Sequence, residues 1–152
     1  MKHYPLHFRL DGNDRYLIWS TDDEGNAPDS IHVHADGSLL TFADVSTLLR
    51  FADRQSLAVV ASKTPVLHDI DASLIWTVGD VSSTLHCNNA LNVWNLYTDA
   101  AATIPTRAKM LGDLLSGHLR LNEMLFYGSN LPAITPKGKQ YSPDWSDNDI
   151  LN

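Results

Sequence analysis

The chain has 152 residues, of which 43% are hydrophobic and 19% are charged. This length and composition are typical of one globular domain with a single core, so we predict one domain over residues 1–152. Eleven Lys and Arg stand against 18 Asp and Glu, which gives a formal net charge of -7. That charge argues against nucleic acid as a direct ligand, because phosphate binding needs a basic surface, and it favours a basic protein as partner.

Two further features bear on the compartment. No apolar run approaches the roughly 18 to 20 residues of a membrane span, and residues 1–14 lack the apolar region and cleavage site of a secretory signal. Cys87 is the single cysteine, so it cannot form an internal disulfide. We therefore expect a cytoplasmic protein with no membrane segment.

The N-terminal part is predicted to form two short β-hairpins. Residues 5–10 and 15–20 are β-rich runs separated by Asp-Gly-Asn-Asp, a strong turn signal. Residues 31–34 and 38–41 flank a second turn, where an Asp-Gly pair supplies the positive φ angles. Residues 21–30, between the hairpins, are polar and acidic, so we predict a surface loop that is a candidate contact region.

His32 and His34 have the spacing that a metal site could use, because residues two apart on a strand share a face. A metal site needs a third and usually a fourth ligand, and the other five of the seven histidines form no ligand pattern with this pair. We therefore predict a solvated or interface strand face here, with no metal and no cofactor.

The middle of the chain alternates between helical and extended patterns. A helix is predicted over residues 41–53, with Thr41 and Asp44 as a capping box. The apolar residues 57–61 predict a short strand beside the hairpins. The spacing over residues 69–79 then fits a short helix that ends near a glycine.

Residues 85–103 carry apolar side chains at i, i+3, i+4 and i+7 spacing, which predicts a long central helix with a broad buried face. Four asparagines lie within this pattern, although Asn is a poor helix former. Two interpretations stay open: either Asn92 or Asn95 ties the helix to a neighbouring loop, or the amides form a row that faces solvent.

A second long helix is predicted over residues 106–127, with a leucine-rich face that favours antiparallel packing on the central helix. Residues 129–145 have three prolines but keep four large apolar residues, so we predict a loop laid on the surface. The prediction for the whole chain is an α+β fold, in which a small antiparallel N-terminal sheet of two hairpins packs with long C-terminal helices.

No motif for catalysis is found: the chain lacks Gly-rich phosphate loops, G-x-S-x-G, H-E-x-x-H and C-x-x-C. Adjacent helix residues point about 100 degrees apart, so His86 and Cys87 have poor geometry for an ion pair, and we interpret Cys87 as a buried structural thiol. Asp69 and Asp71 could act as paired carboxylates, but a place in the first turn of a helix explains them more simply. We expect no enzymatic activity.

Three segments resemble a known group of proteins. They are H-D-I-D-A-S-L-I-W at 68–76, L-N-V-W-N-L-Y-T-D-A-A at 91–101 and Y-G-S-N-L-P-A-I-T-P-K-G-K-Q-Y-S-P-D-W at 127–145. These segments resemble small bacterial cytoplasmic immunity proteins of contact-dependent growth inhibition and related polymorphic toxin systems. The resemblance implies that the protein binds the C-terminal toxin domain of its neighbour, often a nuclease, and blocks its active site or substrate surface. The residues that carry the pattern are interpreted as scaffold, and they are Trp94, Asn95, Asp99, Asn130, Pro132, Tyr141 and Trp145.

Acidic side chains are the candidate contacts for such a partner, because an acidic protein can mimic the phosphate surface that a basic nuclease recognises. They are Asp22, Asp23, Glu24, Asp29, Asp69, Asp71 and Asp80. We expect a monomer or weak dimer that binds the cognate toxin domain. The alternative is a small cytoplasmic enzyme or ligand-binding module with an unrecognised pocket. A toxin gene immediately upstream would favour neutralisation, whereas a metabolic operon would favour the enzyme.

Overall fold

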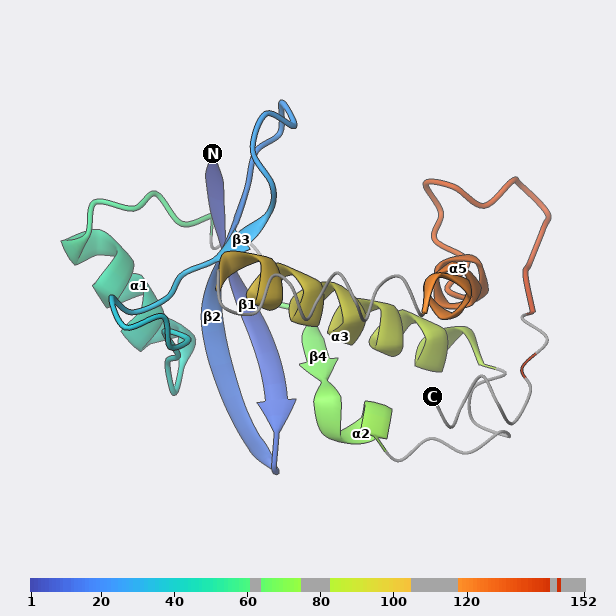
Figure 1. Ribbon diagram of the computed structural model, residues 1–152, viewed down its shortest axis with the longest axis horizontal. Coiled ribbons are helices and arrows are strands. Elements are labelled where there is room, and N and C mark those ends of the chain that lie inside the picture. The colour runs from blue at the N-terminus through green and yellow to red at the C-terminus, as the bar shows by residue number, and fades with distance from the viewer. Residues whose placement is uncertain (61–63, 75–82, 105–117, 143–144, 146–152) are drawn as a thin grey trace.

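The computed structural model describes residues 1–60, 64–74, 83–104, 118–142 and 145. In this part of the chain, a four-stranded sheet stands between helix α1 (Val45–Arg54) on one face and helix α3 (Thr84–Thr103) on the other (Figure 1). Helix α3 extends beyond the sheet, and helix α5 (Leu119–Gly128) packs near its far end. This is an α+β fold, as predicted. No helix in the described ranges has the length and apolar character needed to cross a membrane.

The sheet is built on one long antiparallel hairpin. Strands β1 (Lys2–Leu10) and β2 (Asn13–Thr21) pair over their whole length. The two turn residues both take positive φ, 52° at Asp11 and 70° at Gly12, which suits the twist of a two-residue hairpin. The first predicted hairpin is therefore confirmed, and it is longer than the sequence pattern indicated.

The two edges of the sheet differ from the prediction. Strand β3 (Ser30–Ile31) pairs antiparallel with β2, and the predicted second hairpin is reduced to a bridge between Val33 and Leu39. On the other edge, β4 (Leu67–Asp69) pairs parallel with β1, so the sheet is mixed, with the order β3-β2-β1-β4. The predicted small antiparallel sheet therefore fits β1, β2 and β3, while β4 adds a parallel pair that was not predicted. Three residues are too few for a strand pattern to appear in β4.

Neighbouring residues of β2 are buried on opposite faces of the sheet, because successive side chains of a strand point to opposite faces. Leu17, 1% exposed, packs with Leu96 of α3. Ile18, fully buried, packs with Leu48 of α1. The hairpin therefore holds one helix on each of its faces.

Helix α1 confirms the predicted helix but not its predicted cap. The Asp44 carboxylate accepts a hydrogen bond from the Thr47 N–H at 2.7 Å, and Thr41 lies outside the helix. The strand predicted after α1 is reduced, in the described residues, to a single parallel bridge between Val59 and His3. Helix α1 is thus joined to the sheet mainly by its buried face.

Helix α3 confirms the predicted central helix, and Ser83 is its N-cap. Tyr97, which the pattern placed on the buried face, is 43% exposed, and Trp94 is only partly buried. The buried residues of the helix are Cys87, Ala90, Leu91, Leu96 and Ala101.

Asn89 fixes α3 to strand β4 and to helix α2 (Ile70–Leu74). Its side-chain oxygen accepts the Asp69 N–H at 3.0 Å, and its amide nitrogen donates to the Asp69 carbonyl and to the Ser73 hydroxyl, both at 2.8 Å. An asparagine does tie the helix to its neighbours, but the choice of Asn92 or Asn95 was wrong. The reason is that β4, which the sequence pattern did not reveal, lies beside the first half of α3.

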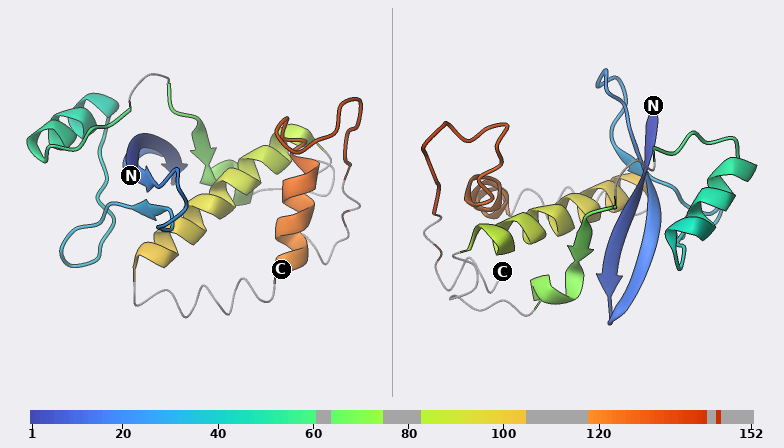
Figure 2. Two further views of the ribbon diagram at one scale, coloured as in Figure 1. Left: turned by 90° about the horizontal axis from the view of Figure 1, so that it is seen from above. Right: turned by 180° about the vertical axis from the view of Figure 1, so that it is seen from behind.

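The first half of α3 shares a second core with α5, in which Ala90 and Leu91 pack with Leu125. Helix α5 is seen end-on in Figure 1, while α3 runs across the picture, and Figure 2 shows from above that α5 crosses α3 obliquely and runs back in the opposite sense. The described part of the predicted second helix therefore packs on the central helix, but at an oblique crossing. Residues 105–117, the first part of the predicted second helix, lie outside the described residues.

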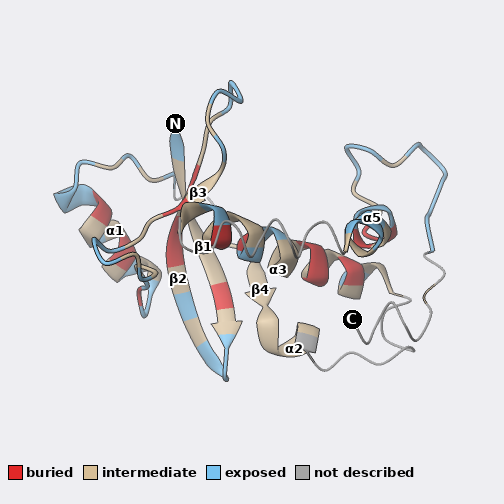
Figure 3. Cartoon of the chain, in the orientation of Figure 1, coloured by how far each residue is buried: buried red, intermediate tan, exposed pale blue. Residues whose placement is uncertain are grey.

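The segment after α5 folds back on this second core. The Asn130 side chain accepts the Tyr141 N–H at 2.6 Å and donates to the Tyr141 carbonyl at 2.9 Å. Leu131 and Trp145 pack against the α3–α5 contact. The predicted surface loop is confirmed for its described residues, and Figure 3 shows buried residues both at the sheet and at this second core.

Candidate functional site

The acids predicted to contact a partner lie in two separate places. The acidic loop (residues 22–29) follows β2, whereas the tip acids, Asp69 and Asp71, lie beside the turn of the β1–β2 hairpin. Asp80 lies outside the described residues. Strands β1 and β2 extend for nine residues each between the two places, which separates them by roughly 25 Å at a rise of about 3.3 Å per residue. The structure therefore does not bring the predicted acids together (Figure 1).

The tip acids are occupied by hydrogen bonds within the chain. The two Asp71 carboxylate oxygens accept the N–H groups of Asp11 and Gly12, each at 2.8 Å. The Asp69 carboxylate accepts the Ala72 N–H at 2.9 Å and lies 3.6 Å from the Arg9 guanidinium. These carboxylates hold the hairpin turn and begin α2. They are therefore poorly placed to contact a partner.

The acidic loop has few compensating positive charges. Asp22 accepts the N–H groups of Glu24 and Asn26 at 3.3 and 3.1 Å, which shapes the turn of the loop. Asp23 pairs with Lys2, and both side chains are 54% exposed. Neither Glu24 nor Asp29 forms an ion pair with a described residue. The loop therefore presents net negative charge to solvent.

The C-terminal end of α3 adds to this negative charge. The Thr103 hydroxyl accepts the Ile31 N–H at 3.0 Å, which holds the last turn of α3 against β3, directly after the loop. That last turn contains no basic residue. Because the C-terminal end of a helix carries a partial negative charge, the helix end and the loop reinforce one another.

A cleft of about 320 Å³ lies between the sheet and α3. Its volume is near the lower end of the range of about 300 to 1,000 Å³ that is typical of ligand pockets. The residues that line it come from β1, β2, β4 and α3 and the segment before β4, and they are Tyr4, Pro5, Leu6, Trp19, Val66, His68, Asn92, Asn95, Leu96 and Asp99.

Asp99 is the acidic side chain of this cleft. Its Oδ2 accepts a hydrogen bond from the Trp19 Nε1–H at 3.0 Å. Burial raises the pKa of Asp99 and the nearby Asp29 raises it further, while the bond from Trp19 opposes them. No described Lys or Arg forms an ion pair with Asp99. The cleft therefore holds a half-buried carboxylate whose charge is incompletely compensated.

His68 and two amides make the cleft rich in hydrogen-bond acceptors. The His68 Nδ1 lies 3.2 Å from the His7 carbonyl and 3.1 Å from the Val66 carbonyl, so Nδ1 carries the proton and Nε2 is the acceptor. Burial lowers the pKa of His68, which keeps the ring neutral near pH 7. The side chains of Asn92 and Asn95 make no hydrogen bond with a described residue.

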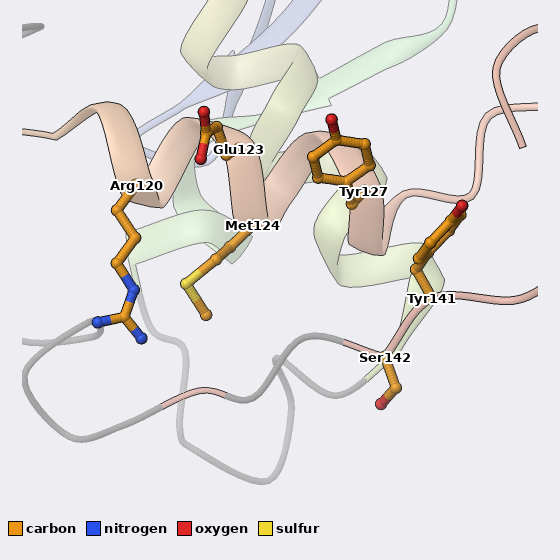
Figure 4. Close-up of a pocket in the computed structure, with 6 residues that line it drawn as sticks. All are labelled: Arg120, Glu123, Met124, Tyr127, Tyr141 and Ser142. Atoms are coloured by element: carbon orange, nitrogen blue, oxygen red, sulfur yellow. The ribbon is translucent and has the colours of Figure 1, made fainter.

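A second hollow of about 430 Å³ lies between α5 and the segment that follows it. Figure 4 shows that Glu123 and Tyr127 point to one side of α5, whereas Arg120 and Met124 extend to the other. Because these groups do not converge on a common point, the hollow lacks the arrangement that catalysis or specific binding needs.

The histidine pair and the cysteine have structural surroundings. The Ser20 hydroxyl lies 3.1 Å from His32 Nε2 and 2.7 Å from His3 Nδ1, while His34 is exposed. Within the described ranges, no group of three His, Cys, Asp or Glu side chains is placed to hold a metal ion. Cys87 is buried, and burial raises the pKa of its thiol, which disfavours the reactive thiolate.

The cleft was missed in the sequence because its residues come from distant segments. One signal was available: Asn92, Asn95 and Asp99 have i, i+3 and i+7 spacing, which places three polar side chains on one face of the central helix. An acid within such a row, next to the buried Leu96, indicates a polar site at the edge of a core.

No family model, curated protein or solved structure matches the chain. The function of the acidic loop and of the cleft is therefore argued from their geometry and charge.

Proposed function

We propose that the protein is a toxin-neutralising binding protein of the immunity type. It acts in the cytoplasm, has no catalytic role, and binds a basic toxin domain so that the active site or substrate surface of the toxin is covered. The observation that carries the proposal is the acidic loop with its four acids, Asp22, Asp23, Glu24 and Asp29. Among the described residues, Lys2 is the one base that forms an ion pair with them.

Electrostatics supports this function in two ways. The formal net charge of -7 gives a field that attracts a basic protein and accelerates its encounter. The loop and the negative end of α3 then concentrate that field at one end of the molecule. Carboxylates at this end compete with phosphate groups for the basic surface of a nuclease. The resemblance in residues 68–76, 91–101 and 127–145 agrees with such a role.

The proposed interface keeps the four acids of the loop and leaves out the tip acids. Asp69 and Asp71 lie roughly 25 Å away along the hairpin, and their carboxylates are occupied by backbone N–H groups. A partner that bound these carboxylate oxygens would compete with the backbone N–H groups of the hairpin turn.

Association kinetics with the toxin domain encoded beside this gene tests the proposal. Wild-type binding should slow as salt rises, because exposed charges act across about 8 to 10 Å near physiological ionic strength. Combining Asp22→Asn, Asp23→Asn and Glu24→Gln should lower the association rate by about tenfold and change the dissociation rate little.

A matched control removes the same number of charges elsewhere. Asp36→Asn, Asp53→Asn and Glu123→Gln neutralise three exposed acids away from the loop, so this variant should associate nearly as fast as wild type. No binding at micromolar concentration contradicts neutralisation itself. A salt-independent association rate contradicts only the role of the loop.

The second candidate is a small enzyme or ligand-binding module, which is favoured by the cleft between the sheet and α3. None of its described lining residues is Ser, Thr, Cys or Lys, and the Asp99 carboxylate and the His68 ring are already engaged by Trp19 and by backbone carbonyls. These residues favour binding over covalent catalysis. A gene neighbourhood with metabolic enzymes and no toxin would favour this candidate.

A further inference from the structure

We propose that the cleft between the sheet and α3 binds one arginine side chain of the basic partner, with the guanidinium group against Asp99. The inference rests on the proposed function, because the partner supplies the arginine. The acidic loop explains how a basic partner is attracted. The cleft adds a site that anchors the partner, and it identifies guanidinium as the chemical group that this site recognises.

The charge of the cleft favours a cation as ligand. Asp99 is half-buried, its Oδ2 is bound to the neutral Trp19 indole N–H, and its Oδ1 has no hydrogen bond to a described residue. A carboxylate withdrawn from water without a counter-charge is unfavourable, and a cation that enters the cleft removes that penalty. Among the described residues, none supplies such a cation.

The hydrogen-bonding groups favour guanidinium over ammonium. The residues that line the cleft carry four kinds of acceptor: Asp99 Oδ1, the Nε2 of neutral His68, and the side-chain oxygens of Asn92 and of Asn95. Guanidinium has five donors in a planar fork and no acceptor, so it can serve several acceptors at once. The lysine ammonium is a compact point charge that matches such a set less well.

The apolar walls fit the remainder of an arginine side chain. The rings of Tyr4 and Trp19 lie 5.8 Å apart between centroids and are tilted, and arginine stacks readily on aromatic faces. Leu6 and Leu96 provide apolar surface for the methylene groups. A volume of about 320 Å³ holds one such side chain.

The cleft lies close to the acidic loop. Asp29 of the loop is close enough to raise the pKa of Asp99, and Thr103 bonds both to the Asp99 carbonyl at 2.7 Å and to Ile31 at the end of the loop. The two features therefore have separable roles. The loop accelerates encounter, and the cleft slows dissociation because the charge pair in it is shielded from water.

A small probe tests the chemistry of the cleft without the toxin. Nα-acetyl-L-arginine amide should shift the NMR signal of the Trp19 indole N–H, identified by its loss in Trp19→Phe, with a dissociation constant in the millimolar range. The Asp99→Asn variant keeps an acceptor for Trp19, yet it should weaken this binding at least about fivefold. Asp36→Asn, a charge removal elsewhere, should leave it unchanged. Nα-acetyl-L-lysine amide should bind more weakly, and the neutral norleucine amide should not shift the signal.

The proposal is overturned if the arginine probe leaves the Trp19 signal unmoved, if it binds Asp99→Asn as well as wild type, or if the lysine probe binds equally. The neighbouring toxin domain supplies a second measurement. There, Asp99→Asn should raise the dissociation rate at least about tenfold and leave the association rate nearly unchanged. A toxin that binds both proteins equally overturns the cleft proposal while neutralisation stands. A toxin that does not bind at all overturns neutralisation, whatever the probe does.

Discussion

The acidic loop and the tip acids contain the same kinds of side chain, yet the two ends of the hairpin use them differently. At the tip, Asp71 accepts two backbone N–H groups of a tight turn, and Asp69 begins a helix. In the loop, Glu24 and Asp29 have no cationic partner among the described residues, and Asp23 has an exposed one. What separates the two ends is where the backbone donors lie: Asp71 accepts N–H groups of a hairpin turn 59 and 60 residues away, whereas Asp22 accepts only N–H groups of its own loop. The count of acids in a sequence does not reveal this difference.

Acids at the hairpin tip and acids in the loop should contribute differently to the free energy of unfolding. A hydrogen bond from an N–H group to a charged acceptor contributes about 1.5 to 3 kcal/mol when shielded, and less when water competes. An exposed ion pair such as Lys2–Asp23 contributes little to stability, because solvent screens it. Removing acids from the tip should therefore harm the fold, whereas removing them from the loop should harm only binding.

The largest effect is expected where α3 holds the segment that carries the tip acids. Asn89→Ala removes three hydrogen bonds and leaves the Asp69 N–H without the Asn89 oxygen, while the Asp69 carbonyl keeps only the Ser73 hydroxyl as a side-chain donor, so the variant should lower the free energy of unfolding by about 2 to 4 kcal/mol. The exposed Asn95 makes no side-chain bond to a described residue, so Asn95→Ala is the control. Equal denaturation midpoints for the two variants would show that Asn89 does not tie α3 to β4.

A smaller effect is expected at the hairpin tip itself. Asp71→Ala leaves two turn N–H groups to water, and it should lower the free energy of unfolding by about 1 to 2 kcal/mol. Asp23→Ala removes one acid from the loop and should shift the urea midpoint little. If both variants unfold at the same urea concentration, the acids of the hairpin tip do not stabilise the fold more than the acids of the loop.

The smallest effect on stability is expected from Asp99, and it depends on pH. Because burial raises the folded-state pKa of Asp99, its ionised form disfavours folding; this penalty is absent below the unfolded pKa and complete above the raised folded pKa. Asp99→Asn should therefore be more stable than wild type at pH 7, and the difference should vanish as the pH falls below about 4. Stability curves at several pH values test this, and a difference that grows in acid has the wrong sign.

The comparison also shows what the sequence could predict. Strong local patterns led to the β1–β2 hairpin, α1, α3 and the end of α5, because each has periodic apolar residues or an explicit turn or cap. Strand β4 has three residues and pairs with the distant β1, so no local pattern indicates it. The hydrogen bonds of Asp69, Asp71 and Asn89 all depend on where β4 and α2 lie, so the sequence pattern did not predict these bonds.

The same distinction between local and long-range features applies to the acidic loop and the cleft. The exposed acidic loop was predicted correctly as a loop, because charge, Gly25 and Pro28 are local properties. The cleft depends on the packing of α3 across β1, β2 and β4, and only the polar row at Asn92, Asn95 and Asp99 hinted at it. The distribution of charge in a sequence thus predicts an exposed charged loop. A cleft cannot be predicted in this way, because it forms only when distant segments pack together.

One pair of variants tests the central difference most directly, because each removes two negative charges from one acidic region. Asp22→Asn with Asp23→Asn should lower the rate of association with the neighbouring toxin domain and leave the free energy of unfolding nearly unchanged. Asp69→Asn with Asp71→Asn should lower the free energy of unfolding, while the fraction that remains folded associates at nearly the wild-type rate. The reverse result, in which the tip variant loses association rate and the loop variant loses stability, would contradict the roles assigned to the two ends.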